Sequence, residues 1–265
     1  MVKAVIIIPA RMGATRFPGK MLAPLAGRPV VAYTAQAAKA VAGVEGVYVA
    51  TDDALIATAA QGQGVPAIMT PPDCRNGTER VAHAYESLVT EGQSAGADVI
   101  INLQGDAPLT PAWVVEAVIQ AFQDPEVAVA TPVVKCSAQT LALFRADRAK
   151  GMVGGTTAVL SQSGRALYFS KEVLPFDGQA EVMDVWHHVG LYAFRPEALS
   201  QYASLPQGPL ELTEGLEQLR FLENDIPVQC VPVEGRGYPF WEVNNPHDIG
   251  RIEDLLAAKG DPNGL

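Results

Sequence analysis

Residues 4–20 read Ala-Val-Ile-Ile-Ile-Pro-Ala-Arg-Met-Gly-Ala-Thr-Arg-Phe-Pro-Gly-Lys, and this stretch decides the fold. Its apolar first part predicts a buried strand over 4–9, and the remainder predicts a loop with glycines and the cations Arg11, Arg16 and Lys20. Glycine lets backbone N–H groups come close to an anion, and guanidinium and ammonium groups supply the opposing charge. The sequence therefore predicts a loop that binds a polyphosphate.

The distribution of charge supports a specific site in this loop. Residues 1–44 contain six basic residues and no acidic one, whereas the whole chain has a formal net charge of −10. The alternative is a solvated loop whose bases serve only solubility, but on such a surface bases are normally mixed with acids. The loop matches neither the Walker A pattern nor the Gly-x-Gly-x-x-Gly fingerprint, so it is a third kind of phosphate loop.

The composition bounds the class of protein. A chain of 265 residues with 48% hydrophobic composition can bury one large core. Its acidic balance argues against nucleic acid or an anionic membrane as a partner. Cys74, Cys136 and Cys230 lie far apart without metal-ligand spacing, which is typical of free thiols in a reducing compartment. The first apolar run is too short for a signal sequence and no run reaches transmembrane length, so we expect a cytoplasmic protein.

The order of predicted elements indicates the fold class. Short apolar runs alternate with helical patterns in the first half, which predicts a three-layer α/β fold with a mostly parallel, mixed sheet. We expect one domain over 1–265, with an inserted lobe at about 135–210 that supplies a dimer interface and a disordered tail at 260–265. Strands are predicted at 4–9, 46–50, 65–69, 98–103, 127–134, 157–160, 166–169, 188–194 and 228–232, and helices at 30–41, 54–61, 78–90, 212–223 and 246–258, with one more starting at Thr110-Pro111.

Acidic residues follow two of the predicted strands. Asp52-Asp53 comes after the second strand, and Gln104-Gly105-Asp106 after the fourth. Ligands of open α/β sheets bind outside the carboxyl ends of the strands. A carboxylate that faces a cationic loop there suits a Mg²⁺-nucleotide, because phosphate oxygens and water complete the octahedral coordination. Asp106 is therefore the candidate Mg²⁺ ligand, and the alternative is that it only caps a turn after Gly105.

These residues also carry a resemblance. The pattern Pro9-Ala10-Arg11-x-x-x-Thr15-Arg16-Phe17-Pro18-Gly19-Lys20 resembles the signature of CMP-sugar synthetases, most closely the 3-deoxy-manno-octulosonate (Kdo) cytidylyltransferases. Six further motifs of that family recur in order: Val49-Ala50-Thr51-Asp52-Asp53, Asn76-Gly77-Thr78-Glu79-Arg80, Asn102-Leu103-Gln104-Gly105-Asp106, Ala166-Leu167-Tyr168-Phe169-Ser170, His188-x-Gly190-Leu191-Tyr192 and Leu216-Glu217-Gln218-Leu219-Arg220.

The resemblance implies a fold of the nucleotide-diphospho-sugar transferase type and a role for each matched residue. Arg11 and Lys20 are expected on the phosphates of CTP, and Gln104 and Asp106 at the reacting centre, with Asp106 on Mg²⁺. The sugar acid is expected at His188, Tyr192, Gln104, Glu217 and Gln218. The nucleotide is expected at Pro9, Ala10, Arg11, Arg16, Lys20, Thr51, Asp52, Gly77, Thr78, Arg80, Gln104 and Asp106.

Without the resemblance, the residues expected at the sugar acid also have ordinary structural interpretations. Tyr192 on an alternating strand is also a normal core residue, and His188 is also a normal strand histidine. Glu217 and Arg220 have the spacing of an ordinary ion pair on a helix surface.

The chain departs from the family pattern at three places. Ala14 stands where a serine is usual, Ala107 stands where an acid is usual, and Asn244 stands where the second metal-binding aspartate is expected. Asparagine keeps a carbonyl oxygen but loses the charge, which weakens metal binding. Glu242 lies two residues earlier and on the same face if the segment is extended, so both Glu242 and Asn244 are candidate metal ligands.

The implied reaction is the transfer of CMP from CTP to a 2-keto-3-deoxy sugar acid, Kdo or a relative, with Mg²⁺ and release of pyrophosphate, for lipopolysaccharide or surface-glycan synthesis. The implied partners are CTP, an acidic sugar and a second copy of the chain. A cytidylyltransferase for a sialic-acid type of sugar and a non-catalytic nucleotide-binding protein stay open. A glycosyltransferase is disfavoured, because Asp52-Asp53 lacks the Asp-x-Asp spacing.

Overall fold

One mixed sheet runs through the molecule in the computed structural model, which describes residues 2–13, 16–93, 96–152, 155–176 and 184–265. Ala14 and Thr15 of the predicted phosphate loop lie outside the described residues. The strands of this sheet are β1 (Ala4–Ala10), β4 (Val44–Thr51), β5 (Ala67–Met69), β6 (Val99–Leu103), β7 (Val129–Lys135), β8 (Thr156–Leu160), β9 (Ala166–Ser170), β10 (Trp186–His188), β11 (Leu191–Phe194) and β12 (Gln229–Pro232).

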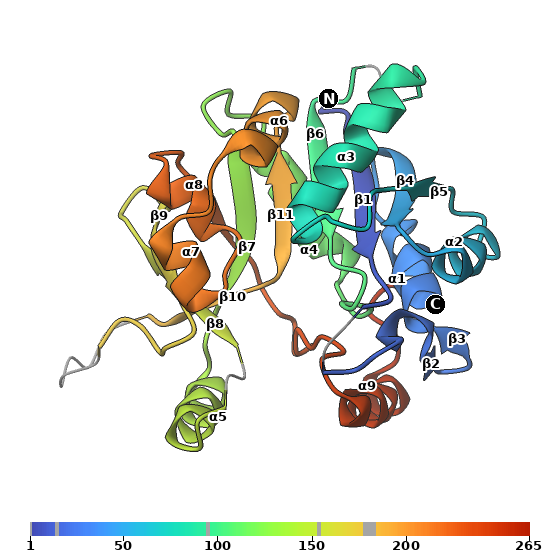
Figure 1. The fold of residues 1–265 in the computed structure, drawn as a ribbon. Helices are drawn as coiled ribbons and strands as arrows, with labels where there is room; N and C mark the ends of the chain where they lie inside the picture. The colour runs from blue at the N-terminus through green and yellow to red at the C-terminus, as the bar shows by residue number, and fades with distance from the viewer. Residues whose placement is uncertain (1, 14–15, 94–95, 153–154, 177–183) are drawn as a thin grey trace.

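The strand order is β5-β4-β1-β6-β11-β7-β10-β8-β9, with β12 beside β7 (Figure 1). The strands of the first half, β5, β4, β1 and β6, pair in parallel, and β11 then enters antiparallel between β6 and β7. The α/β fold with a mixed sheet is confirmed, and its parallel part holds the strands that precede the predicted phosphate and metal motifs.

Helices cover both faces of the sheet (Figure 1). They are α1 (Val30–Ala38), α2 (Ala54–Gln61), α3 (Gly77–Thr90), α4 (Ala112–Ala121), α5 (Ala138–Ala149), α6 (Pro196–Ser204), α7 (Pro209–Glu214), α8 (Leu219–Glu223) and α9 (Pro246–Lys259), with a 3₁₀ turn η1 (Lys20–Leu22) and a small ribbon of β2 (Pro24–Leu25) and β3 (Arg28–Pro29).

The central strand β1 is buried along its whole length and divides the core into two layers. Side chains of a strand alternate between its faces. Ile6 and Ile8 belong to the cluster that contains residues of α1, α2 and α4, whereas Val5 and Ile7 belong to the cluster that contains residues of α3 and α6. The run of β-branched residues at the start of the chain therefore becomes the middle strand of a three-layer structure.

The helices α2 and α3 start at or next to the predicted residues, and α4 starts later than predicted. The Asp53 carboxylate accepts the N–H groups of Leu55 and Ile56 at 2.8 and 3.1 Å, so α2 begins where the sequence predicts. Asn76 caps α3 by accepting the Glu79 N–H at 2.9 Å. Thr110 does not cap α4, because its hydroxyl donates to the Ala107 carbonyl and the helix starts one residue later than expected.

Two predicted elements are each split at a glycine. The strand expected over 188–194 is two strands, and Gly190 lies between β10 and β11. The helix expected over 212–223 is α7 and α8, because Gly215 takes φ of 61° and ends α7. Glycine adopts this left-handed conformation without the steric cost of a Cβ. Predicted site residues lie next to both breaks.

The predicted lobe at about 135–210 includes strands and helices on both sides of β7. β11 lies in the central sheet and α6 packs on α3, so residues 191–204 belong to the main body. The strands β10, β8 and β9 continue the same sheet beyond β7 (Figure 1). The division of the chain into domains stays a prediction.

The end of the chain packs on the body, and the expected disorder over 260–265 is not what the structure shows. The Asn263 side chain accepts the Ala112 N–H at 2.8 Å and donates to the Thr110 carbonyl at 3.2 Å. The hydroxyl of Tyr33 donates to Asp261. Side-chain hydrogen bonds, which the glycine- and proline-rich composition does not reveal, hold this segment. Among the described helices, none is both long enough and apolar enough to cross a membrane.

Candidate active site at the carboxyl ends of the parallel strands

The predicted site residues gather where β4, β1 and β6 end. Ala10, the last residue of β1, pairs with Thr51, the last residue of β4. On the other side β1 pairs with β6, which leads directly into Gln104. Parallel neighbours end at the same edge of a sheet, so the phosphate loop, Asp52 and the Gln104–Asp106 turn share that edge.

A close backbone approach fixes the turn at 104–106. A Cβ on Gly105 would lie 2.8 Å from the Pro9 carbonyl oxygen, which is closer than real Cβ contacts. The Thr34 hydroxyl of α1 donates to the Gly105 carbonyl at 2.8 Å. Glycine is therefore required between Gln104 and Asp106, and the turn is held against the end of β1.

The phosphate loop and the metal motif meet through Lys20 and Asp106. The amine of Lys20, in η1, donates to the Asp106 carboxylate as a salt bridge. Both side chains are largely buried, with 14% and 16% of their surface exposed. The alternative that Asp106 only caps a turn does not account for this contact, because its carboxylate faces a cation from a distant part of the chain.

The other two cations of the loop differ in their contacts. Arg16 is exposed and its guanidinium donates to the Asn244 side-chain oxygen at 3.1 Å. Arg11 directly follows β1 and its side chain is exposed at the same strand end. Arg11 therefore lies where a phosphate chain beside Lys20 could reach it.

The segment before α9 completes this part of the site. The Val243 N–H donates to the Asp106 carbonyl at 2.8 Å, which sets Glu242 and Asn244 beside the metal motif. The Asn244 amide donates to the Glu242 carboxylate at 3.3 Å. Burial raises the pKa of Glu242 to about 7 and the charge of Asp106 adds to this, while Asn244, Lys20 and Arg16 oppose it.

A second group of residues lies at the end of β4. Arg80 of α3 is buried, donates to the Thr70 hydroxyl at 2.5 Å and forms an ion pair with Asp52 at 3.5 Å. The Thr51 hydroxyl accepts the Asp53 N–H at 3.2 Å. The predicted nucleotide residues Thr51, Asp52 and Arg80 are therefore brought together.

A chain of hydrogen bonds joins Gln104 to Glu217, one of the predicted sugar residues. Gln104 donates to Asn102 at 3.0 Å, and Asn102 donates to the Thr78 hydroxyl at 3.2 Å. The Thr78 N–H donates to the Glu217 carboxylate at 3.1 Å. Gly77 is part of this arrangement, since a Cβ there would lie 3.2 Å from the Gln104 amide. Burial raises the pKa of Glu217, and the bonds from Thr78 oppose that change.

Tyr192 and Gln218 form a second pair on this side. Because Gly190 separates β10 from β11, Tyr192 pairs with Asn102 of β6 and comes next to the site. Its hydroxyl donates to the Gln218 side-chain oxygen at 2.9 Å. The Gln218 amide nitrogen is buried and has no hydrogen-bond partner among the described residues. A buried donor of this kind is costly unless a ligand accepts from it.

His188 lies beside Tyr192, with ring centroids 5.5 Å apart, and its tautomer can be assigned. The Thr131 hydroxyl has one proton, which it donates to the Leu191 carbonyl at 2.7 Å. The contact of 2.9 Å between His188 Nε2 and this hydroxyl is then donated by the histidine. Burial lowers the pKa of His188 to about 3, so the ring is neutral.

Arg220 holds the two sides of the site together, and sequence reasoning missed it. Its fully buried guanidinium donates to Glu211 at 2.6 and 2.7 Å and to Glu79 at 3.0 Å, and lies 4.2 Å from the centre of the Tyr202 ring. The surface pair of Glu217 with Arg220 is thus wrong. A lone arginine among the apolar residues after Glu217 was the available signal.

The Tyr202 hydroxyl makes a further link between the two sides. It accepts from the Asn76 amide at 2.8 Å and donates to the Glu217 carbonyl at 3.2 Å. The N-terminus of α3 and the break between α7 and α8 are therefore tied directly to each other.

The donor set beside Asp106 fits a Mg²⁺ ion. Asp106, Glu242 and Asn244 offer carboxylate and amide oxygens, the ligands that this ion prefers, and Mg²⁺ bound to a nucleotide needs only one or two of them. Ala107 is buried and offers no donor. No group of three or more His, Cys, Asp or Glu side chains with metal-binding geometry occurs within the part of the chain that the structure describes.

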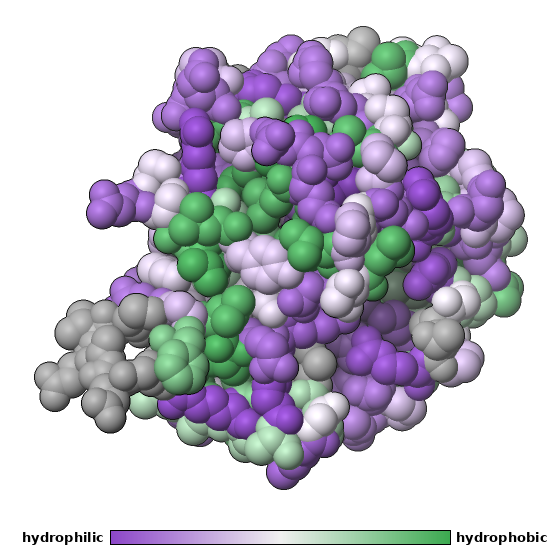
Figure 2. Space-filling model, turned by 60° about the vertical axis from the view of Figure 1, so that its left-hand side comes forward, coloured by the Kyte–Doolittle hydropathy of each residue, from purple (hydrophilic) through white to green (hydrophobic). Residues whose placement is uncertain are grey.

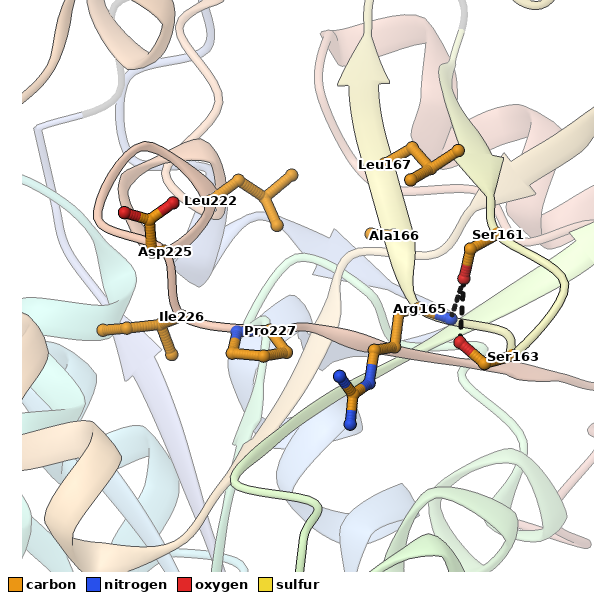
Figure 3. Close-up of a pocket in the computed structure, with 9 residues that line it drawn as sticks. All are labelled: Ser161, Ser163, Arg165, Ala166, Leu167, Leu222, Asp225, Ile226 and Pro227. Atoms are coloured by element: carbon orange, nitrogen blue, oxygen red, sulfur yellow. Dashed lines mark hydrogen bonds between the residues drawn. The ribbon is translucent and has the colours of Figure 1, made fainter.

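A hollow with a volume of about 380 Å³ lies elsewhere. Figure 3 shows it between the β8–β9 turn and the segment after α8. None of the predicted site residues lines it. It is lined by Ser161, Ser163, Arg165, Ala166, Leu167, Leu222, Asp225, Ile226 and Pro227.

Comparisons with known proteins show the family of this chain. A family model described as cytidylyltransferase matches residues 5–228. The chain is 45% identical to the 3-deoxy-manno-octulosonate cytidylyltransferase of Maricaulis maris, over 96% of this chain and 97% of that protein. It is 39% identical to the same-named protein of Acidobacterium capsulatum, over 96% of each chain.

Solved structures give the same result. A CMP:2-keto-3-deoxy-manno-octonic acid synthetase complexed with CTP superposes with a TM-score of 0.82 at 35% identity, over 97% of this chain and 99% of that one. The resemblance read from the motifs is thereby confirmed. The matched family model, the two relatives and this structure together show that the chain is a member of the cytidylyltransferase family.

Proposed function

We propose that this chain transfers CMP from CTP to Kdo or a closely related 2-keto-3-deoxy sugar acid, giving a CMP-sugar and pyrophosphate for lipopolysaccharide synthesis. The relatives above, named for this activity, match the chain over nearly its whole length. The observation that carries the proposal is the contact of Lys20 with Asp106, because it joins a phosphate-binding loop to a metal-binding carboxylate at one strand edge.

In the proposed reaction the anomeric hydroxyl oxygen of the sugar bonds to the α-phosphorus of CTP. The bond from that phosphorus to the bridging oxygen breaks, pyrophosphate leaves and the hydroxyl proton is lost. Arg11 and Lys20 neutralise the negative charge on the phosphates, and Gln104 orients the groups that react. Positioning and charge stabilisation are the main contributions that a protein makes to phosphoryl-type transfer.

We propose Mg²⁺ as the metal, with Asp106 among the residues that hold it. When bound to CTP, this ion neutralises charge on the phosphates and favours departure of pyrophosphate. Lys20 then pairs with a phosphate in place of Asp106. Arg16 supports the loop through its hydrogen bond to Asn244, the residue after Val243, whose N–H donates to the Asp106 carbonyl.

The base and ribose of CTP are proposed to lie along the N-terminus of α3 and the end of β4. Gly77, Thr78 and Arg80 belong to the helix start, and Thr51 and Asp52 to the strand end. The Asp52 carboxylate oxygen nearest Arg80 is buried without a hydrogen-bond partner among the described residues, at 3.5 Å from the guanidinium. A nucleoside donor that bonded this oxygen would remove the cost of its burial.

The sugar acid is proposed to bind between Gln104 and the Tyr192–Gln218 pair, with Glu217 accepting from its hydroxyls. The unpartnered Gln218 amide supports this, since it supplies a donor for a sugar oxygen. His188 is neutral and therefore suited to a hydroxyl and not to pairing with the sugar carboxylate.

A screen of acceptors tests this function. Purified protein is given Mg²⁺, each of the four NTPs in turn, and Kdo, other 2-keto-3-deoxy acids or sialic acid, and released pyrophosphate is measured. We expect release with CTP and Kdo. Preference for sialic acid would favour the sialic-acid type, and tight CTP binding without release for any acid would favour a non-catalytic nucleotide-binding protein.

We also propose that the protein is a homodimer, joined through the side that carries β9 and α7. β9 is at the end of the strand order, and beyond the bridge of Arg165 to Gln229 no strand among the described residues covers its outer edge. Leu167 on β9 is 61% exposed, Leu212 on α7 is 65% exposed and Phe176 is 86% exposed. Figure 2, which turns this side forward, shows apolar side chains gathered there. A molar mass near that of one chain in light scattering would contradict the dimer.

A cytoplasmic location is proposed on the cysteines. Cys74, Cys136 and Cys230 are all free thiols. Burial raises the pKa of each. Unpaired buried thiols are typical of a reducing compartment.

A further inference from the structure

We propose that Glu242 supplies the second carboxylate for the divalent cation that Asp106 holds, and that Asn244 orients Glu242 without binding the cation. This inference rests on the proposed function, because it concerns the metal of the same site. The sequence leaves Glu242 and Asn244 as alternative ligands, and the contacts around residues 242–244 favour Glu242.

The backbone sets Glu242 beside Asp106. The Val243 N–H bonds to the Asp106 carbonyl, and the Val243 side chain is fully buried in the cluster with Leu25. The side chains of Glu242 and Asn244 are hydrogen-bonded to each other, so both lie on one side of the segment, away from that cluster. They are therefore presented together at the metal motif.

The carboxylate of Glu242 lies against Gly190, which has no side chain. A Cβ placed on Gly190 would lie 2.6 Å from Glu242 Oε1 and 3.9 Å from Gln104 Cγ. Any side chain at position 190 would therefore displace the carboxylate. The break between β10 and β11 thus provides a place for Glu242 next to Gln104, within the reacting centre.

The charged groups around Glu242 favour binding of a cation there. The groups that act on it are Asp106, which repels it, and Lys20 and Arg16, which attract it; Glu242 in turn acts on Tyr192. In the proposed complex Lys20 is engaged by phosphate, which leaves the carboxylates of Glu242 and Asp106 with less positive charge to offset their repulsion. A divalent cation between oxygen donors of this kind relieves that repulsion.

Asn244 is already engaged at both ends of its amide. Its oxygen accepts from Arg16 at 3.1 Å and its nitrogen donates to Glu242 at 3.3 Å. Only an amide makes both bonds, because a carboxylate cannot donate to Glu242. Asn244 therefore links Arg16 of the phosphate loop to Glu242 and holds the Glu242 carboxylate in its orientation.

Manganese binding, measured apart from turnover, tests this assignment. Mn²⁺ is titrated into the full chain with and without saturating CTP, and bound metal is followed by water-proton relaxation. We expect Glu242→Gln to weaken Mn²⁺ binding by at least about tenfold, comparable to the loss of a ligand contact, and Asn244→Ala to weaken it less. Glu253→Gln is the matched control, since Glu253 of α9 only accepts the Ala26 N–H, and it should bind Mn²⁺ normally.

Two more variants keep the test independent of any one substitution. Gly190→Ala leaves every charge in place but displaces the carboxylate, and it should also weaken Mn²⁺ binding. Asn244→Asp alone should not tighten binding, whereas Glu242→Gln combined with Asn244→Asp should recover part of the loss. Thermal unfolding of each variant checks that it is folded.

The inference is wrong if Glu242→Gln and Gly190→Ala bind Mn²⁺ within about twofold of the unaltered protein, or if Asn244→Ala alone abolishes binding. Pyrophosphate release by the unaltered protein, measured in parallel, separates this failure from failure of the proposed function. Normal release with unchanged Mn²⁺ affinity in the variants rejects the role of Glu242 only. No release with any sugar acid rejects the proposed function, while the Mn²⁺ titration still decides the ligand.

Discussion

The amine of Lys20 lies against the carboxylate of Asp106, across 86 positions of sequence. One residue comes from the loop after β1 and the other from the turn after β6, so the pair exists only because these strands are parallel neighbours. In the proposed complex each residue changes partner: Lys20 takes a phosphate and Asp106 takes the metal. In this proposal the contact marks the place where the metal and the triphosphate bind side by side.

Lys20→Ala should lower kcat by at least about 100-fold, because it removes a cation from the charge that develops on the phosphates. The largely buried pair also contributes to stability. Loss of one partner leaves Asp106 unpaired beside Glu242, so unfolding free energy should fall by about 1–2 kcal/mol. Lys39→Ala is the control, since Lys39 is exposed and only donates to the Gln63 carbonyl. Turnover of Lys20→Ala close to normal would contradict the role given to this residue.

Arg220→Met should destabilise the protein by about 3–5 kcal/mol, because it leaves the buried carboxylates of Glu211 and Glu79 without their cation. Chemical denaturation measures this directly. The matched control is Arg75→Met, which removes the other arginine on Glu79. Arg75 is half exposed, so its ion pair should contribute no more than about 1 kcal/mol. An equal loss of unfolding free energy in the two variants would contradict the claim that the buried Arg220 stabilises the protein more than the half-exposed Arg75.

Tyr202→Phe removes only the hydroxyl that links Asn76 to the Glu217 carbonyl. The ring stays over Arg220, so the fold should persist with a loss of about 1–2 kcal/mol for the unmade bonds. We expect KM for the sugar acid to rise severalfold while KM for CTP changes less. Tyr85→Phe, on α3, serves as the control. Steady-state kinetics with each substrate varied in turn distinguishes this from a uniform loss, which would argue for a structural role alone.

Stability should depend on pH through His188. Its folded pKa, about 3, lies below the ordinary value of 6.5, so between these values the unfolded chain binds a proton that the folded one does not. The stabilisation is then complete above about pH 6.5 and is lost as pH falls toward 3, by up to about 1.4 kcal/mol per pH unit. Urea unfolding from pH 7 to 4 measures the slope, and His188→Gln should make it shallower. An unchanged slope would mean that the ring is not buried neutral.

Local signals predicted the first half of the chain well. The β-branched run of β1 and the helical patterns of α2 and α3 depend on residues close together in the chain, so these elements could be read from sequence. The phosphate loop and the 104–106 turn were predicted for the same reason, and the strand order then brings them together.

The remaining features depend on contacts that no local pattern contains. Gly190 lies inside a pattern that alternates like one strand, and Gly215 lies inside a pattern that repeats like one helix. In both cases tertiary packing determines that the element is interrupted at the glycine. Arg220 is bonded to Glu79 from a helix far away in sequence, so its burial could not be read from its neighbours. The orientation of Asn244 toward Arg16 and Glu242 depends on the same kind of distant pairing.

A crystal structure of this protein with CTP and Mg²⁺ is the most direct test of the central claim. We predict that the Lys20 amine leaves Asp106 for a phosphate oxygen, and that an Asp106 oxygen coordinates the metal at about 2.0–2.1 Å. A triphosphate bound away from the loop after β1, with Lys20 and Asp106 still paired to each other, would contradict it.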